Sequence, residues 1–175
     1  PNVRSQIMAG VRGYLKAWDP IKQQEAWHVE LPGVWNGGML STGGSLVFQG
    51  NSAGQFAAYN AETGAALWST PVQAGVIAAP ISYVVAGQQH VAIVVGWGGT
   101  IPLSSGEYSR KGAPPYNKSR VLAFRLGGRE QLPPPPAAAA APTPPARVAD
   151  QQTLGLGKLL FHASCSGASP LQYTL

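Results

Sequence analysis

Turn-rich antiparallel β structure is the fold class that this 175-residue sequence predicts. Glycine (22) and proline (16) are abundant, and this composition favours short strands and tight turns over helical bundles. Apolar runs of strand length alternate with turn signals along the first two thirds of the chain. One segment also repeats an earlier one at a fixed distance. Together these observations predict an all-β domain that is long enough to bury a hydrophobic core.

The repeat consists of the segments AWDPIKQQEAW and AYNAETGAALW, and the distance from Ala17 to Ala58 and from Trp27 to Trp68 is 41 residues. A period near forty residues with short strands is typical of a β-propeller, in which each blade is a four-stranded antiparallel sheet. The two tryptophans would then lie at equivalent places in successive blades and pack between them. The alternative is a β-sandwich with two unrelated tryptophans, which the matching residue types at fixed positions make less favourable.

The third residue of each repeat, Asp19 or Asn60, can close a turn by accepting hydrogen bonds from the backbone amides that follow it. LVFQGNSAGQFAAYN predicts a hairpin that turns at Asn51–Gly54, and ISYVVAGQQHVAIVVG predicts another that turns at Ala86–Gln89. RVLAFRLGG resembles a third, decayed copy of the repeat. We therefore expect two to three blades between about residues 12 and 126, too few to close a ring.

Three parts follow along the chain. Residues 1–131 are predicted to form the propeller blades. Residues 132–150 contain four consecutive prolines and an alanine run, and they predict a stiff, extended linker that packs no core. Residues 151–175 are predicted to be a poorly ordered tail.

Composition and motifs exclude several function classes. The net charge is +5, but the basic residues are scattered, so we expect no nucleic-acid partner. No apolar run approaches the length of a membrane span. The single cysteine, Cys165, cannot form an internal disulfide. The sequence shows no Ser/His/Asp set, no phosphate loop and no metal-ligand spacing, and its acidic residues are dispersed, so it predicts no catalytic residue and no metal ligand.

The ordered set of motifs resembles a known family. A-x-(D/N)-x-x-T-G-x-x-x-W is similar to the tryptophan-docking motif of eight-bladed quinoprotein dehydrogenases, which use pyrroloquinoline quinone (PQQ). The stretches from GYLKAWDPIKQQEAW to VLAFRLGG, followed by a proline-rich linker, resemble the C-terminal propeller segment and linker of type II quinohaemoprotein alcohol dehydrogenases. The resemblance runs over roughly residues 8 to 167. It implies a partial eight-bladed β-propeller.

The resemblance also implies a periplasmic enzyme that oxidises alcohols to aldehydes with PQQ and calcium. Electrons would pass to a haem c and then to an acceptor such as a cytochrome or a blue-copper protein. In the family, the calcium ligands and the catalytic aspartate belong to earlier blades, so this chain is expected to be a fragment that is inactive by itself and packs against the rest of the propeller. The alternative is a non-catalytic propeller that acts as a scaffold for protein interactions.

Two glycine-rich motifs, WNGG and GWGG, occur where the blade strands of that family reach the central axis. Glycine lets a backbone approach a planar ligand closely, an amide can bond its polar edge, and an indole can wall it off. The predicted cofactor-binding residues are Trp35, Asn36, Gly37, Gly38, Gly96, Trp97 and Gly98. Tight packing at a propeller axis would also require small residues, so both interpretations stay open.

The tail LLFHASCSGASPLQYTL resembles the approach to a haem c attachment site that is not completed. Such a site needs C-x-x-C-H, two thiols for the haem vinyl groups and a histidine for the iron. Cys165 matches the first thiol, but Ala168 and Ser169 stand at the positions of the second thiol and the histidine. We therefore expect a broken haem site, of the kind that a truncated or frameshifted gene gives, and no covalent haem. The alternative is a cysteine in an unrelated tail.

Overall fold

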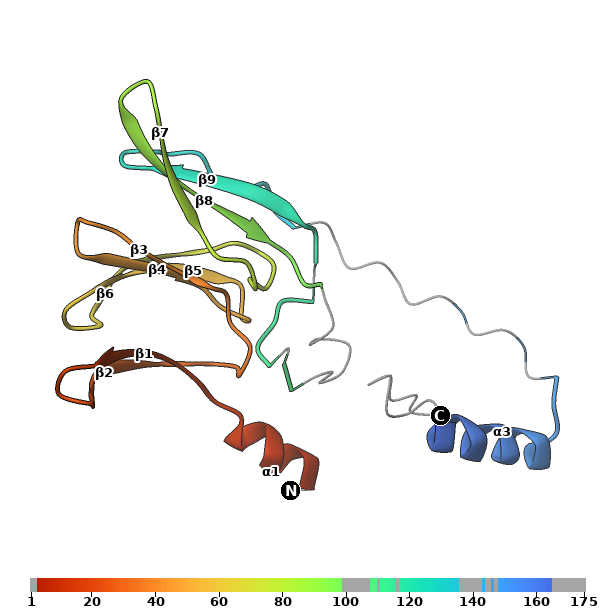
Figure 1. The fold of residues 1–175 in the computed structure, drawn as a ribbon. Coiled ribbons are helices and arrows are strands. Elements are labelled where there is room, and N and C mark those ends of the chain that lie inside the picture. Colours follow the sequence, from red (N-terminus) through yellow and green to blue (C-terminus); the bar gives the residue numbers. More distant parts are fainter. Residues whose placement is uncertain are drawn as a thin grey trace.

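The computed structural model describes residues 3–98, 108–109, 111–115, 117–135, 143, 146 and 148–164. Within these residues, three antiparallel sheets lie one above another (Figure 1). The first sheet contains β1 (Gly13–Asp19) and β2 (Gln24–Leu31). The second contains β3 (Met39–Ser41), β4 (Leu46–Gly50), β5 (Gln55–Asn60) and β6 (Ala66–Pro71). The third contains β7 (Ile81–Val85), β8 (Gln88–Val95) and β9 (Arg120–Arg125). The predicted all-β class is confirmed: the second sheet is a four-stranded blade, flanked by two smaller ones.

Both predicted hairpins are present. Strands β4 and β5 are joined by a turn in which the Gly54 amide donates to the Asn51 carbonyl at 3.2 Å. Gly54 has a φ of 77°, which explains the glycine at this position. Strands β7 and β8 are joined through Ala86 and Gly87, whose φ angles are 50° and 75°. Two successive left-handed residues are the geometry of a tight type I′ hairpin turn.

The two repeats occupy equivalent places in their sheets. Ala17 lies opposite Trp27 in the first sheet, and Ala58 lies opposite Trp68 in the second. In each pair of strands the register shifts directly after that alanine, between Ala17 and Trp18 and between Ala58 and Tyr59. The 41-residue offset therefore reflects a repeated blade geometry, as the sequence predicted.

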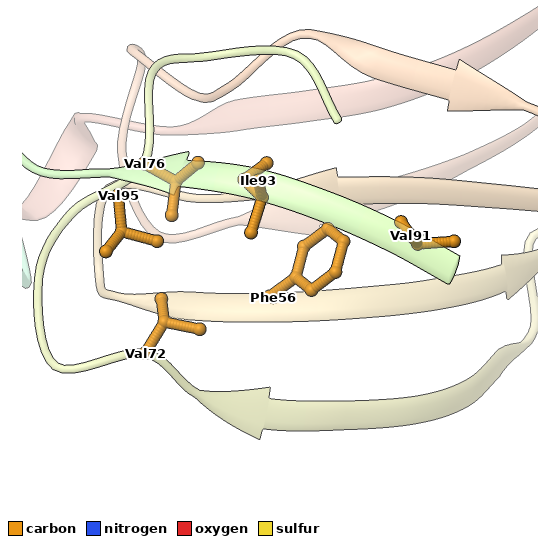
Figure 2. Packing of buried hydrophobic residues seen from close by; sticks show 6 residues of the cluster. All are labelled: Phe56, Val72, Val76, Val91, Ile93 and Val95. Carbon is orange, nitrogen blue, oxygen red and sulfur yellow. The ribbon is translucent and has the colours of Figure 1, made fainter. Parts of the chain in front are cut away.

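The main core lies between the second and third sheets (Figure 2). Phe56 from β5 is fully buried and meets three residues of β8, Val91, Ile93 and Val95. Fully burying an aliphatic or aromatic side chain of this size stabilises a fold by about 1.5–3 kcal/mol relative to leaving it exposed. This cluster therefore holds the third sheet on the second.

A second core lies between the first and second sheets. Leu15 and Leu31 from the first sheet pack on Ala57 and Tyr59 from β5. Because Phe56 faces the other core, β5 is buried on both of its faces. Its neighbours along the strand are therefore apolar on both sides, with none of the usual alternation of polar and apolar residues. A strand covered on both faces is what the middle blade of a stack requires.

Two helices were not predicted. Helix α1 (Val3–Gly10) precedes the first sheet, and α3 (Gln151–Ser164) follows the linker. We expected a poorly ordered tail where the structure has α3. The helix starts there because an N-cap residue lies at the end of the linker. The Asp150 side chain accepts a hydrogen bond from the Thr153 backbone amide at 2.7 Å, as an N-cap residue does. Residues 165–175, including Cys165, lie outside the described part.

Protonation of Asp150 is expected to weaken the first turn of α3. The backbone amide of Thr153 holds the pKa of this carboxyl below its ordinary value of 3.8. A lowered folded-state pKa means that the ionised cap stabilises the helix above about pH 4, and that this contribution is lost as the pH falls through the lowered pKa. The amide proton shift of Thr153, followed by NMR, should titrate accordingly. Asp150→Asn should retain the cap without this pH dependence, and a titration that persists in this variant would contradict the assignment.

Candidate functional site

The inter-blade contact is built from Trp27 and the turn that follows β5. Asn60 Oδ1 accepts hydrogen bonds from the amides of Glu62 at 2.8 Å and Thr63 at 3.0 Å, as the sequence predicted for this side chain. The turn places Gly64, with a φ of 73°, directly under the indole: a Cβ at Gly64 would lie 2.6 Å from Trp27 Cε3. Trp27 Nε1 also donates to the Ala61 carbonyl at 3.0 Å. A tryptophan of one blade is thus docked on the turn of the next.

Trp68 is not docked in the same way. Its ring meets the edges of Phe56, at 6.0 Å between centroids, and Phe124 from β9, at 5.5 Å. In the third sheet, β9 and the turn after it have the sequence RVLAFRLGG, which lacks the T-G of the second repeat. An aromatic side chain therefore takes the place of the glycine turn, and Trp68 remains 41% exposed.

The WNGG motif forms the connection from β2 to β3. The Asn36 side chain donates from Nδ2 to the Gly33 carbonyl at 2.8 Å and accepts at Oδ1 from the Ser52 amide at 3.2 Å. One amide hydrogen of Asn36 is therefore used within its own loop, and the bond from Ser52 ties this loop to the β4–β5 turn of the second sheet. Trp35, directly before it, is exposed.

Gly37 and Gly38 lie where a side chain would not fit. A Cβ at Gly37 would lie 2.8 Å from the Ala78 carbonyl oxygen, and one at Gly38 would lie 2.7 Å from the Ala79 Cβ. The Gly37 amide donates to the Gly50 carbonyl at 2.9 Å. These glycines are needed because the loop packs against the segment that follows β6.

The GWGG motif meets the same segment from the third sheet. Gly96 has a φ of 131° and donates its amide to the Gly75 carbonyl at 2.8 Å. The Trp97 indole lies on Gly75, where a Cβ would come within 2.2 Å of Nε1. Asn117 holds the Trp97 backbone from both sides: Oδ1 accepts from the Trp97 amide at 2.6 Å, and Nδ2 donates to its carbonyl at 3.2 Å. Gly98 is exposed, and a Cβ there would meet nothing within 4 Å.

The structure thus brings the two predicted motifs onto one segment, residues 75–79. Gly37 and Gly38 lie against Ala78 and Ala79, and Trp97 lies against Gly75. Trp35 and Gly98 are exposed. Sequence reasoning missed Gly75 and Asn117. Gly75 lies within QAGVIAAP, a run of small residues that signals close backbone approach, but no sequence signal identifies Asn117 as the residue that holds Trp97.

Two buried polar atoms near these motifs have no hydrogen-bond partner among the described residues. They are Nε1 of Trp97, a donor, and Oε1 of Gln49, an acceptor. Gln49 is 8% exposed, and its Nε2 donates to the Gly37 carbonyl at 2.8 Å. An unsatisfied buried polar group costs free energy, so each of these atoms marks a place where a further polar group would be stabilising.

The described residues contain no cluster of three or more His, Cys, Asp or Glu that could hold a metal ion. The carboxylates with shifted pKa values lie at the surface. A backbone hydrogen bond from Lys22 lowers the pKa of Asp19, and a hydrogen bond from Lys16 lowers that of Glu25. Neither is close to the two glycine-rich motifs in the sheet arrangement. No helix in the described part is long and apolar enough to cross a membrane.

Stacked antiparallel blades, with a tryptophan of one blade docked on the turn of the next, define a β-propeller segment of the tryptophan-docking type. Residues 8–91 match the family described as "PQQ: Glucose/ethanol/alcohol dehydrogenase, beta-propeller domain". Residues 8–91 therefore match the PQQ-type β-propeller family, as the motif resemblance predicted.

Relatives match the chain over most of its length. It is 49% identical over 167 residues to the quinohemoprotein alcohol dehydrogenase ADH IIB of Pseudomonas putida, covering 90% of this chain and 23% of that protein. It is 39% identical over 165 residues to the dehydrogenase subunit of an alcohol dehydrogenase (quinone) of Acetobacter aceti, covering 94% of this chain and 22% of that protein. The solved structure of the quinohemoprotein alcohol dehydrogenase ADHIIG of P. putida HK5 superposes with a TM-score of 0.76 at 43% identity, covering 90% of this chain and 23% of that chain. The chain thus spans less than a quarter of the length of these relatives.

Proposed function

We propose that the protein containing this chain is a quinoprotein alcohol dehydrogenase that oxidises alcohols to aldehydes with PQQ. The observation that carries this proposal is the convergence of the WNGG and GWGG motifs on residues 75–79 of a PQQ-type propeller. The relatives' names support the reaction class, because the aligned proteins are quinone-dependent or quinohemoprotein alcohol dehydrogenases.

The residues present fit the cofactor. PQQ, when bound, supplies an ortho-quinone that accepts the two electrons of alcohol oxidation, and its carbonyl and carboxylate groups are hydrogen-bond acceptors. Asn36 has a second amide hydrogen beyond the one given to Gly33, and the buried Trp97 Nε1–H has no acceptor among the described residues. These two donors would hold the polar edge of the cofactor, while the indole excludes water and Gly37 and Gly38 keep the backbone close.

The remaining chemistry would come from other blades. The described residues provide no metal cluster, so calcium and a catalytic aspartate would be held elsewhere in the propeller, and this chain alone would be inactive. We further propose a periplasmic location and electron transfer to a haem c, then to an acceptor such as a cytochrome or a blue-copper protein. One relative, 44% identical over 121 residues, is named 1-butanol dehydrogenase (cytochrome c). Because C-x-x-C-H is incomplete around Cys165, this tail would attach no haem by two thioethers.

Cofactor binding tests the proposal directly. Asn36→Ala in the intact apo-protein should weaken PQQ binding by about ten- to a hundredfold, the effect of losing a hydrogen bond to a charged or strongly polar group. Trp97→Phe, which keeps an aromatic wall but removes the donor, should weaken it by a similar factor. Equilibrium dialysis with PQQ and calcium measures the affinity without relying on turnover.

Gln89→Ala is the matched control, because Gln89 Nε2 donates to Ser82 Oγ at 2.8 Å in the β7–β8 hairpin, at the opposite end of β8 from Gly96. This variant should bind PQQ as the parent protein does. Unchanged affinity in both Asn36→Ala and Trp97→Phe would show that the motifs serve packing alone. Absence of PQQ binding by the parent protein itself would favour the non-catalytic scaffold.

A further inference from the structure

Gln73, directly after β6, adopts a backbone conformation that side-chain-bearing residues rarely take. Its φ is 64°, in the left-handed region that favours glycine. The backbone around it is fixed, since Val72 and Ala74 are each 1% exposed and the Val72 amide donates to the Gly54 carbonyl at 2.8 Å. Glycine would fit this position with less strain. The presence of a glutamine therefore indicates that its side chain makes a contact that offsets the backbone strain.

The Gln73 side chain joins two segments that are distant in sequence. Its Oε1 accepts a hydrogen bond from Arg120 Nη1 at 3.1 Å, at the start of β9. Its Nε2 donates to the Pro133 carbonyl at 2.8 Å, at the start of the proline run. Because a guanidinium can only donate, Arg120 fixes which end of the amide faces it and directs the Nε2 donor toward Pro133.

The chemistry of the linker explains why a donor is needed. Proline has no backbone N–H, so the run that begins at Pro133 can offer only carbonyl oxygens to a neighbouring surface. A glutamine held by an arginine supplies the matching donor. We propose that Gln73, oriented by Arg120, anchors the proline-rich linker and fixes where it leaves the third sheet.

This anchor has a consequence for whatever follows the linker. A proline-rich segment is extended, at about 3.1 Å per residue, and it stays stiff over several residues. Fixing its first carbonyl therefore also limits the directions in which α3 and later residues are presented. The inference is independent of the proposed redox function, because it rests on contacts within the chain.

Limited trypsin digestion of the intact protein tests the anchor. Arg129 lies four residues before Pro133, so cleavage after it is expected to increase when the start of the linker detaches and its backbone can enter the protease, whereas cleavage after Arg147 near the end of the linker serves as an internal reference. Gln73→Glu keeps an acceptor for Arg120 but removes the donor to Pro133, and Gln73→Gly removes the side chain while relieving the backbone strain. Both should raise the ratio of Arg129 to Arg147 cleavage by about two- to tenfold, the population change expected for one hydrogen bond.

Gln23→Gly is the matched control, because Gln23 is an exposed glutamine with a φ of 52° and makes no described side-chain hydrogen bond. It should leave the cleavage ratio unchanged. The proposal is overturned if both Gln73 variants retain the parent ratio, or if Gln23→Gly raises it equally. A rise in Gln73→Gly without one in Gln73→Glu would also overturn it, because the bond to Pro133 would then not hold the linker.

Discussion

Trp27→Ala is expected to lower the free energy of unfolding by about 3 kcal/mol, the lower end of the range for deleting a large aromatic side chain from a core. The lower end applies because the indole is partly exposed. The loss combines the contact with Gly64 and the hydrogen bond from Nε1 to the Ala61 carbonyl. Urea unfolding of the intact protein, followed by circular dichroism, measures it.

Trp27→Phe separates the two contributions, since it retains a ring on Gly64 but cannot donate to Ala61. Its free energy of unfolding should fall by less than that of Trp27→Ala, and about 1 kcal/mol of this decrease should come from the lost hydrogen bond. Trp68→Ala is the comparison at the equivalent register position, and a smaller loss of stability is expected because Trp68 is 41% exposed and meets the ring of Phe124 in place of a glycine turn. Equal stability of Trp27→Ala and the parent protein would show that the docking contact does not hold the blades.

Gly64→Ala is expected to destabilise the protein by about 2–5 kcal/mol, for two separate physical reasons. An alanine at a φ of 73° costs about 1–2 kcal/mol from backbone sterics. Its Cβ would also lie 2.6 Å from Trp27 Cε3, and overpacking of this kind costs about 1–3 kcal/mol. The indole would have to leave the turn, so the two blades would separate locally.

Gly87→Ala isolates the backbone contribution. Gly87 has a φ of 75°, but a Cβ there would meet nothing within 4 Å. Its substitution should therefore cost about 1–2 kcal/mol, from backbone sterics alone. In a Trp27→Ala background, Gly64→Ala should cost only the backbone contribution, because the ring that its Cβ would meet is absent. The free-energy changes of the two substitutions are therefore expected not to be additive. An equal loss for Gly64→Ala and Gly87→Ala would mean that Trp27 does not rest on this turn.

The docked tryptophan and the candidate site are connected through the same sheets. The second sheet is held by Trp27 on one side and by the Phe56 core on the other. The WNGG and GWGG loops then reach residues 75–79 from opposite neighbours of that sheet. Loosening either blade contact would therefore move one of the two motifs. We expect the substitutions at Trp27 and Gly64 to weaken binding at the candidate site as well.

The sequence by itself determined the repeat, the hairpins and the turn residues. These features are local: a left-handed glycine, an asparagine that accepts from the next amides, and apolar runs of strand length depend on a few neighbouring residues. The equivalence of Trp27 and Trp68 was also readable, because equal spacing in sequence becomes equal register when blades repeat. The helix from residues 151 to 164 was missed, although the cap at Asp150 is itself a local signal.

The tertiary structure alone decided which neighbours the candidate residues meet. Asn36 was predicted as a donor to a cofactor, and the structure shows one of its amide hydrogens bonded to Gly33 and its oxygen to the Ser52 amide. Trp97 meets Gly75 and Asn117, and Gln73 meets Arg120 and Pro133, over separations of 20 to 60 residues in sequence. No periodicity encodes such pairs, because they arise only when separate sheets stack and their loops close on one another.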